Sequence, residues 1–398
     1  MNMNRLVRRQ STRVFAAALA MNGCAFGDTA TGGSTGVGAA RVAWRVDIVS
    51  PATAGMIAAD AERLYVYESG ASMVAIGLAD QRIKWRLGTN EIDVDRPLRG
   101  ISLCGGTVVF GSISAIYGAV PSTGALSWRL QPSLGGALYL GAPVCSDSTV
   151  YIGTSQQQRV YAVNARTGTE RWAVDLTPPS GARGFVWTPS VSDGVIVACT
   201  REFTTPFGGL VIGLDAASGR ELWRYRWSPL APTVDAGCAE PTAAGGGLGL
   251  ASVDDGRVFA FDLHSGVIRW TQVPVEGYLT RTEERPIAIT DAVVMVGSLS
   301  GILTGLELST GRQLWRIGSI AAIYETNIID PLVGDKGQFV GINEGGWALA
   351  IDARTGARQW TVQRGKKTNE RILFASGVLT PDLFIAIGSD AVYALRRY

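Results

Sequence analysis

Short apolar runs separated by turn residues recur along most of the chain. Residues 160–163, 211–214 and 258–261 are runs of this kind, and each ends at an Asn or Asp followed within a few positions by Ser/Thr-Gly. Runs this short are typical of β-strands, and glycine beside Asn or Asp favours tight turns because glycine readily takes a positive φ. The pattern therefore predicts antiparallel strands joined by hairpins.

Eight tryptophans recur along the same stretch at nearly even spacing. Successive members are between 41 residues (85 − 44) and 51 residues (223 − 172) apart. Six of them end the pattern Ser/Thr-Gly-x-x-x-Trp, so each glycine stands four residues before its tryptophan. A period of this length indicates a repeat architecture. The eight are Trp44, Trp85, Trp128, Trp172, Trp223, Trp270, Trp315 and Trp360.

Each repeat has the pattern of one β-propeller blade, with three or four antiparallel strands. A blade cannot bury both faces alone, so we expect the flat tryptophan to pack against the neighbouring blade and its indole N–H to find a carbonyl. Residues 41–44 carry a tryptophan without a preceding turn, and residues 391–395 match the strand before a turn, although none follows. The N-terminal strand is therefore expected to complete the last blade.

The predicted fold is an all-β, eight-bladed β-propeller over residues 41–398. Its blades are four-stranded and antiparallel, and the ring is closed by the N-terminal strand, which leaves no unprotected sheet edge. We expect a monomer. The 50 glycines suit many tight turns, and a net charge of +2 with 18% charged residues gives no reason to expect nucleic acid or an anionic membrane surface as a partner.

The repeat resembles that of the pyrroloquinoline-quinone-type propellers. Residues 161–172 read Tyr-Ala-Val-Asn-Ala-Arg-Thr-Gly-Thr-Glu-Arg-Trp, and residues 350–356 repeat the first part of this pattern. The resemblance covers residues 41–398. Within that superfamily, the length, the single domain and the closing strand are similar to the BamB family of outer-membrane assembly lipoproteins. This implies an exported, non-enzymatic scaffold whose partner is an envelope protein, such as a component of the β-barrel assembly machinery.

Two other functions remain open at this point. Quinone-dependent dehydrogenases share the propeller, and they typically hold the quinone beneath a disulfide of adjacent cysteines, over a tryptophan, with a calcium or lanthanide ion. This chain has no adjacent cysteines, and its only histidine, His264, lies in a turn, so we assign no catalytic, cofactor-binding or metal-binding residue. The third interpretation is a receptor for a cell-wall polymer.

The N-terminus has the pattern of a targeting segment. Residues 1–24 combine basic residues with a short apolar run at 14–21, and they end in Met-Asn-Gly-Cys, which resembles a lipoprotein processing site. We therefore expect Cys24 to be lipidated, with residues 25–40 as a flexible linker, in an outer-membrane lipoprotein that faces the periplasm and contacts the membrane only through its lipid. The alternative is cleavage after Ala-Leu-Ala at residues 18–20, which would release a soluble periplasmic protein.

Four cysteines lie within the predicted propeller. They are Cys104, Cys145, Cys199 and Cys238. An even number in an exported protein permits disulfides. Cys104 and Cys145, however, occupy nearly equivalent positions of successive repeats on apolar strands. We therefore expect small buried side chains instead of bridges.

The predicted partner surface lies at one mouth of the ring. Five repeats begin their first strand with a proline, a position where no ladder donor is needed. The residues just before these prolines must line the mouth, and many are charged or aromatic, although a solvated rim is the alternative. The candidates are Trp187, Glu240, Glu283, Glu284, Arg285, Tyr324, Glu325 and Asp330.

Overall fold

All secondary structure in the described part of the chain is β-strand, in 34 strands arranged as eight sheets. The computed structural model describes residues 42–48, 57–68, 72–88, 100–111, 115–133, 139–140, 142–155, 158–178, 181, 184–203, 208–228, 237–238, 242–273, 287–297, 302–318, 329–335, 337–343, 347–363, 374–388 and 391–397. The expected signal segment, Cys24 and the linker lie outside these residues.

Each sheet is one blade, and its strands follow one another in chain order from the centre outward, except that the N-terminal strand is the outermost strand of blade 8. Blade 1 holds β2 (Ile57–Ala59), β3 (Arg63–Glu68), β4 (Ser72–Gly77) and β5 (Ile83–Leu87). Blade 2 holds β6 (Ile101–Cys104), β7 (Thr107–Gly111), β8 (Ile116–Ala119) and β9 (Leu126–Leu130). Blade 3 holds β10 (Tyr139–Leu140), β11 (Val144–Ser146), β12 (Thr149–Ser155), β13 (Arg159–Asn164) and β14 (Glu170–Asp175). Blade 4 holds β15 (Gly184–Val186), β16 (Ser190–Ser192), β17 (Val195–Glu202), β18 (Gly209–Asp215) and β19 (Glu221–Trp227).

The remaining blades repeat this order. Blade 5 holds β20 (Ala243–Gly245), β21 (Leu248–Ser252), β22 (Val258–Asp262) and β23 (Ile268–Gln272). Blade 6 holds β24 (Ile287–Thr290), β25 (Val293–Gly297), β26 (Leu303–Glu307) and β27 (Gln313–Ile317). Blade 7 holds β28 (Ile329–Asp335), β29 (Gln338–Asn343), β30 (Trp347–Asp352) and β31 (Arg358–Gln363). Blade 8 holds β32 (Phe374–Leu379), β33 (Leu383–Gly388), β34 (Ala391–Arg396) and β1 (Val42–Asp47).

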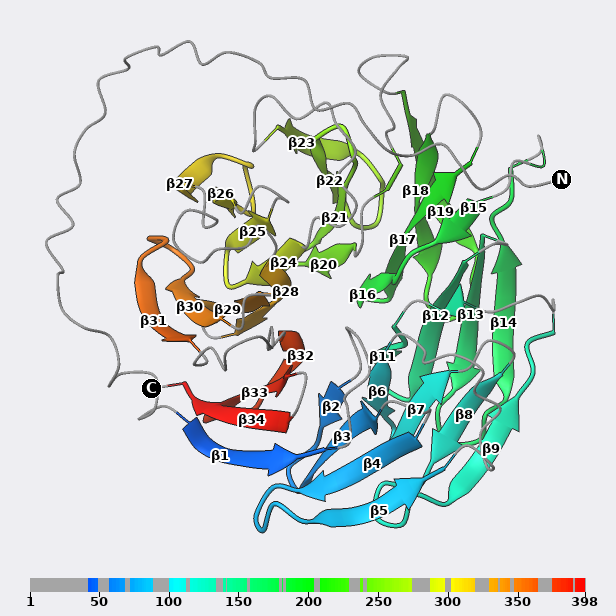
Figure 1. Ribbon diagram of the computed structural model, residues 1–398. Coiled ribbons are helices and arrows are strands. Elements are labelled where there is room, and N and C mark those ends of the chain that lie inside the picture. The colour runs from blue at the N-terminus through cyan, green and yellow to red at the C-terminus, as the bar shows by residue number, and fades with distance from the viewer. Residues whose placement is uncertain are drawn as a thin grey trace, which may run out of the picture. The chain divides into compact units, whose positions relative to one another are not determined.

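The innermost strands form a closed ring. β2 contacts β6, β6 contacts β11, and contacts continue through β16, β20, β24 and β28 to β32, which contacts β2. β1 pairs antiparallel with β34 as the outer strand of blade 8, so the two ends of the propeller meet in one sheet (Figure 1, blue beside red). The predicted eight-bladed propeller and its closure by the N-terminal strand are confirmed.

The Ser/Thr-Gly turns form as their residue types dictate. The turn glycines have positive φ, for example 73° at Gly219 and 69° at Gly266. The side chain of Asp215 accepts the backbone N–H of Ser218 at 2.8 Å, which satisfies a donor that the hairpin leaves unpaired. In blade 1 the equivalent position is Gln81, which takes a φ of 57° without being glycine. The local turn geometry therefore persists where the sequence pattern is broken.

The tryptophans fill the space between neighbouring blades. A Cβ atom on Gly118, opposite Trp128 in the same blade, would lie 2.2 Å from the indole, and one on Gly168 in the turn of the next blade would lie 2.5 Å from it. The Trp128 indole donates its N–H to the carbonyl of Ala165 at 2.8 Å. The same bond, at 2.7–3.1 Å, joins Trp85 to Pro121, Trp172 to Ala216, Trp223 to Leu263, Trp270 to Leu308 and Trp315 to Ala353. The other two tryptophans lie in β1 and β31, where Trp44 pairs with Ala394 and Trp360 with Ala350.

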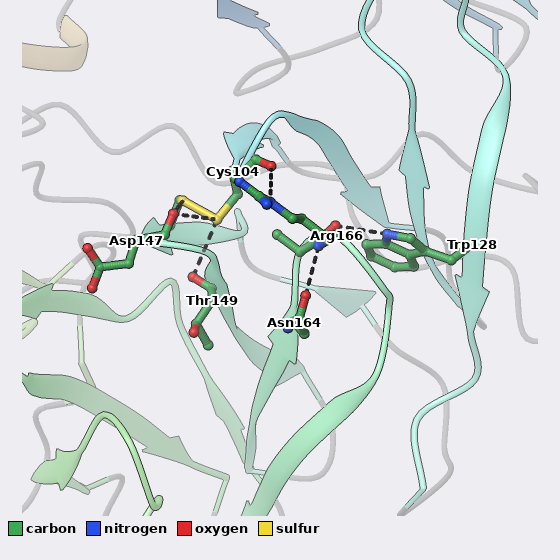
Figure 2. The surroundings of a disulfide bond; sticks show 9 residues. Cys104, Trp128, Asp147, Thr149, Asn164 and Arg166 are labelled. Carbon is green, nitrogen blue, oxygen red and sulfur yellow. Dashed lines mark hydrogen bonds between the residues drawn. A yellow bond between two sulfur atoms is a disulfide. The ribbon is translucent and has the colours of Figure 1, made fainter.

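The expectation that the cysteines are unbridged is wrong. Cys104 is bonded to Cys145 and Cys199 to Cys238, with Cα–Cα distances of 5.5 and 6.0 Å. Both distances lie within the usual range for a disulfide. Equivalent positions in successive blades are close because β6 and β11 are neighbouring inner strands (Figure 2). The equivalent positions of Cys104 and Cys145 in successive blades, which had argued against a bridge, are therefore what brings the two cysteines close enough to form it.

Candidate functional site

The best-described candidate surface lies at one edge of blades 4 and 5. Because pairing within a blade is antiparallel, the loop between its second and third strands lies at the same edge as the segment that enters its first strand. Phe185 and Trp187 precede β16, Arg201 and Phe203 lie at the end of β17, and Asp254 follows β21. We call these five residues the blade 4–5 cluster.

Three aromatic rings make up the apolar part of the cluster. Phe185 packs edge-to-face on Trp187 with ring centroids 4.3 Å apart, and its centroid is 5.3 Å from that of Phe203. The Trp187 indole donates its N–H to the carbonyl of Cys238 at 2.7 Å, which ties blade 4 to the segment that enters blade 5. Phe203 is 49% exposed and is the most open of the three rings. Trp187, the one predicted candidate with a described side chain, is half-buried and supports this ring.

The polar part of the cluster is a buried ion pair between Arg201 and Asp254. Arg201 Nη1 lies 3.0 Å from Asp254 Oδ2, and the two side chains are 14% and 2% exposed. The arginine stem runs over Gly237, where a Cβ atom would come within 2.7 Å of it. The backbone N–H of Asp254 donates to the carbonyl of Gly237 at 3.0 Å. Glycine at position 237 therefore allows the blade 4 arginine to reach the blade 5 loop.

A second ion pair fixes the next residue of that loop. Arg257 Nη2 lies 2.5 Å from Asp255 Oδ2 and also donates to the carbonyl of Ser228 at 2.7 Å. Its guanidinium lies 5.1 Å from the ring centroid of Phe259. Both loop carboxylates are therefore paired with arginines. The cluster offers apolar contact and fixed charge, the properties of a recognition surface.

The sequence located this edge through Trp187 but missed the other four residues. The aromatic and acidic residues of the loops at 201–208 and 253–257 were a usable signal, whereas the pairing of Arg201 with Asp254 across a blade boundary was not. Asp330 lies in β28 opposite Ile342. The remaining predicted candidates lie outside the described residues: Glu240, Glu283, Glu284, Arg285, Tyr324 and Glu325.

The described residues do not fit a quinone cofactor or its metal ion. Both disulfides join cysteines of different blades, 41 and 39 residues apart, and neither is a bridge between adjacent cysteines. No group of three or more His, Cys, Asp and Glu side chains within the described part of the chain could hold a metal ion. His264 is exposed at its turn. The described residues form no helix that is long and apolar enough to cross a membrane.

A family model matches most of the propeller sequence. The model of the family described as "Outer membrane protein assembly factor BamB" matches residues 109–273 and 254–397. An outer membrane protein assembly factor BamB from Yersinia pestis is 26% identical over 231 residues, which are 56% of this chain and 53% of that protein. The chain thus aligns with about half the length of this relative.

Other similarities reach beyond this family. The quinohemoprotein alcohol dehydrogenase ADH IIB of Pseudomonas putida is 29% identical over 184 residues, which are 42% of this chain and 24% of that enzyme. The crystal structure of BamB from Moraxella catarrhalis superposes with a TM-score of 0.63 at 14% identity, and the match covers 89% of this chain and 100% of that one. At this identity, the structural similarity supports the fold alone.

Proposed function

The chain belongs to the family of outer membrane protein assembly factor BamB, whose model spans most of the propeller, and on that basis we propose that it is a non-enzymatic scaffold for envelope assembly. In this function the propeller binds an envelope protein and helps outer-membrane proteins to assemble. The family match over residues 109–397 is the observation that carries the proposal. A shared fold alone would not, because propellers host many functions.

The partner surface in this proposal is the edge that holds the blade 4–5 cluster. Exposed aromatic residues are enriched at protein interfaces, and Phe203 is such a residue on a rigid support. The two buried ion pairs keep the loop beside it in one conformation, which lowers the entropy that binding would otherwise cost. The charged residues Glu283, Glu284 and Arg285 in the next entry segment would contribute orientation and association rate more than affinity.

The proposed location is the outer membrane, with the propeller in the periplasm and Cys24 carrying the lipid. Two disulfides fit this location because such bonds persist in oxidising compartments. Replacing Cys24 with serine should move the protein from the membrane fraction to the soluble fraction, or leave it unprocessed. Unchanged processing of the Cys24→Ser variant would instead support cleavage after Ala-Leu-Ala and a soluble periplasmic protein.

Capture of partners from solubilised envelope tests the proposed surface. Phe203→Ala should weaken capture roughly tenfold, the effect of losing about 1.4 kcal/mol at an interface anchor. Charge reversal at Glu283 and Glu284 should weaken it further. The matched control is Val267→Ala, which removes an apolar side chain that is 57% exposed at a Ser/Thr-Gly turn. Equal loss from Phe203→Ala and Val267→Ala would remove this surface from the proposal.

A further inference from the structure

The two disulfides share one arrangement. Each joins cysteines that are consecutive in the propeller sequence, separated by 41 and 39 residues, which is close to one repeat. Cys104 ends β6 in blade 2 and Cys145 lies in β11 of blade 3. Cys199 lies in β17 of blade 4, and Cys238 precedes β20 of blade 5 and pairs with Val253. Each bridge therefore closes one blade boundary.

Three of the four cysteines are buried once the boundaries have closed, whereas Cys145 is only partly buried. Cys199 and Cys238 are 0% exposed, and Cys104 is 2% exposed. Cys104 Sγ lies 3.5 Å from the carbonyl of Thr149, which begins β12 of the next blade (Figure 2). The neighbouring turn is covered by Arg166, which donates to the carbonyl of Gly105 at 3.0 Å. In the finished propeller an oxidising protein cannot reach Cys104 or Cys199, the first cysteine of each pair, so their reaction with it must come before the blades dock.

The order of the bridges matches the order in which an exported chain emerges. We propose that a protein thiol–disulfide oxidant forms them in sequence during export, first Cys104–Cys145 and then Cys199–Cys238. The thiolate of the first cysteine attacks the disulfide of the oxidant, which gives a mixed disulfide and releases one thiolate of the oxidant. The second cysteine attacks the mixed disulfide, forms the bridge and releases the other thiolate. Two electrons and two protons pass from the pair to the oxidant, which becomes a dithiol.

This order places a requirement on the fifth cysteine. The chain has five, and Cys24 precedes the other four. If Cys24 were a free thiol, oxidation in order of emergence would pair it with Cys104 and then pair Cys145 with Cys199. Both bridges would be non-native, and Cys238 would be left unpaired. Lipidation of Cys24, or its removal with the signal segment, leaves the remaining four cysteines to form the native pairs. This step rests on the proposed export and processing.

Removal of one cysteine from each end of the series tests the order. The full-length chain is expressed for export, quenched with acid shortly after a labelling pulse, alkylated and mapped by mass spectrometry, which requires no folded protein. Cys104→Ser should yield Cys145–Cys199 as the main early bridge, because Cys145 then emerges without an earlier partner. The matched variant Cys238→Ser should retain Cys104–Cys145 and leave Cys199 reduced.

Two outcomes would overturn the proposal. If Cys104→Ser gives only Cys199–Cys238 with Cys145 reduced, docking of the blades selects the pairs and the order of emergence does not. If all four wild-type thiols are alkylated in cells that contain the oxidant, no oxidation occurs during export. In cells that lack the oxidant, all four should be alkylated. None of these results depends on capture of an envelope partner, so failure of the scaffold proposal would be separately visible.

Discussion

At the scale of single residues, one pair of residue types recurs at the blade boundaries. A tryptophan in the outer strand of one blade lies on a positive-φ glycine in the turn of the next, as Trp270 does on Gly311, where φ is 71° and a Cβ atom would lie 2.6 Å from the indole. The indole N–H donates to a backbone carbonyl of that same turn region. The packing of Trp270 and its hydrogen bond therefore both require that residue 311 has no side chain.

Truncation of Trp270 tests this contact. Trp270→Ala should lower the free energy of unfolding by roughly 3–5 kcal/mol, because it empties a buried site and leaves the Leu308 carbonyl without its donor. Ile268→Ala, on the same strand but 37% exposed, is the matched control and should change stability by less than about 0.5 kcal/mol. Urea denaturation of both variants measures the difference. Similar small losses at the two positions would show that the tryptophan is not an inter-blade contact.

The turn carboxylates predict how stability depends on pH. Hydrogen bonds from Arg269 and then from Ser265 hold the pKa of Asp262 well below its usual range, and hydrogen bonds from Ser218 lower that of Asp215. A carboxyl whose pKa is depressed in the folded state stabilises the protein above its unfolded pKa of about 3.9, and this stability is lost as pH falls through the folded pKa. The melting temperature should therefore fall on acidification below about pH 4. Asp262→Asn should reduce that slope, and an unchanged slope would contradict this assignment.

At the scale of elements, β1 covers the outer edge of blade 8, where no other described strand pairs with β34. It pairs along β34 from Val42 opposite Leu395 to Asp47 opposite Ala391. A chain that begins at Ile48 lacks this strand and should aggregate and unfold more easily, because the edge of β34 becomes available to other chains. A chain that begins at Arg41 keeps β1 and is the control. Sedimentation and thermal unfolding compare the two, and equal monomer content and stability would contradict closure by β1.

The sequence predicted the elements better than their contacts. The period repeats in every blade and the Ser/Thr-Gly turn in six of them, so the eight blades and the closing strand followed from local pattern. The disulfides were missed because the linear sequence does not show that inner strands of successive blades are neighbours, which brings Cys104 to Cys145. The ring contact of Phe185 with Phe203 was missed for a similar reason, since it depends on the short strand β15 pairing with the end of β17.

At the scale of the whole molecule, the chain is a closed and cross-linked ring, with the proposed recognition surface on one edge. Residues 36–398 form one compact unit, and two of its eight blade boundaries carry a disulfide. Closed pairing and covalent bridges oppose large internal motion, which suits a scaffold that presents a fixed surface. The proposed scaffold function therefore requires no rearrangement of the ring.

The function proposed for this propeller is to assist the assembly of outer-membrane proteins. The most direct test is the abundance of folded β-barrel proteins in outer membranes of cells with and without the gene, measured by quantitative mass spectrometry. Absence of the protein should lower the abundance of β-barrel proteins and leave that of lipoproteins unchanged. The wild-type chain should restore the β-barrel proteins, and the Phe203→Ala variant should restore them less. Unchanged β-barrel abundance together with loss of a quinone-dependent oxidation would contradict the proposed function and favour the dehydrogenase.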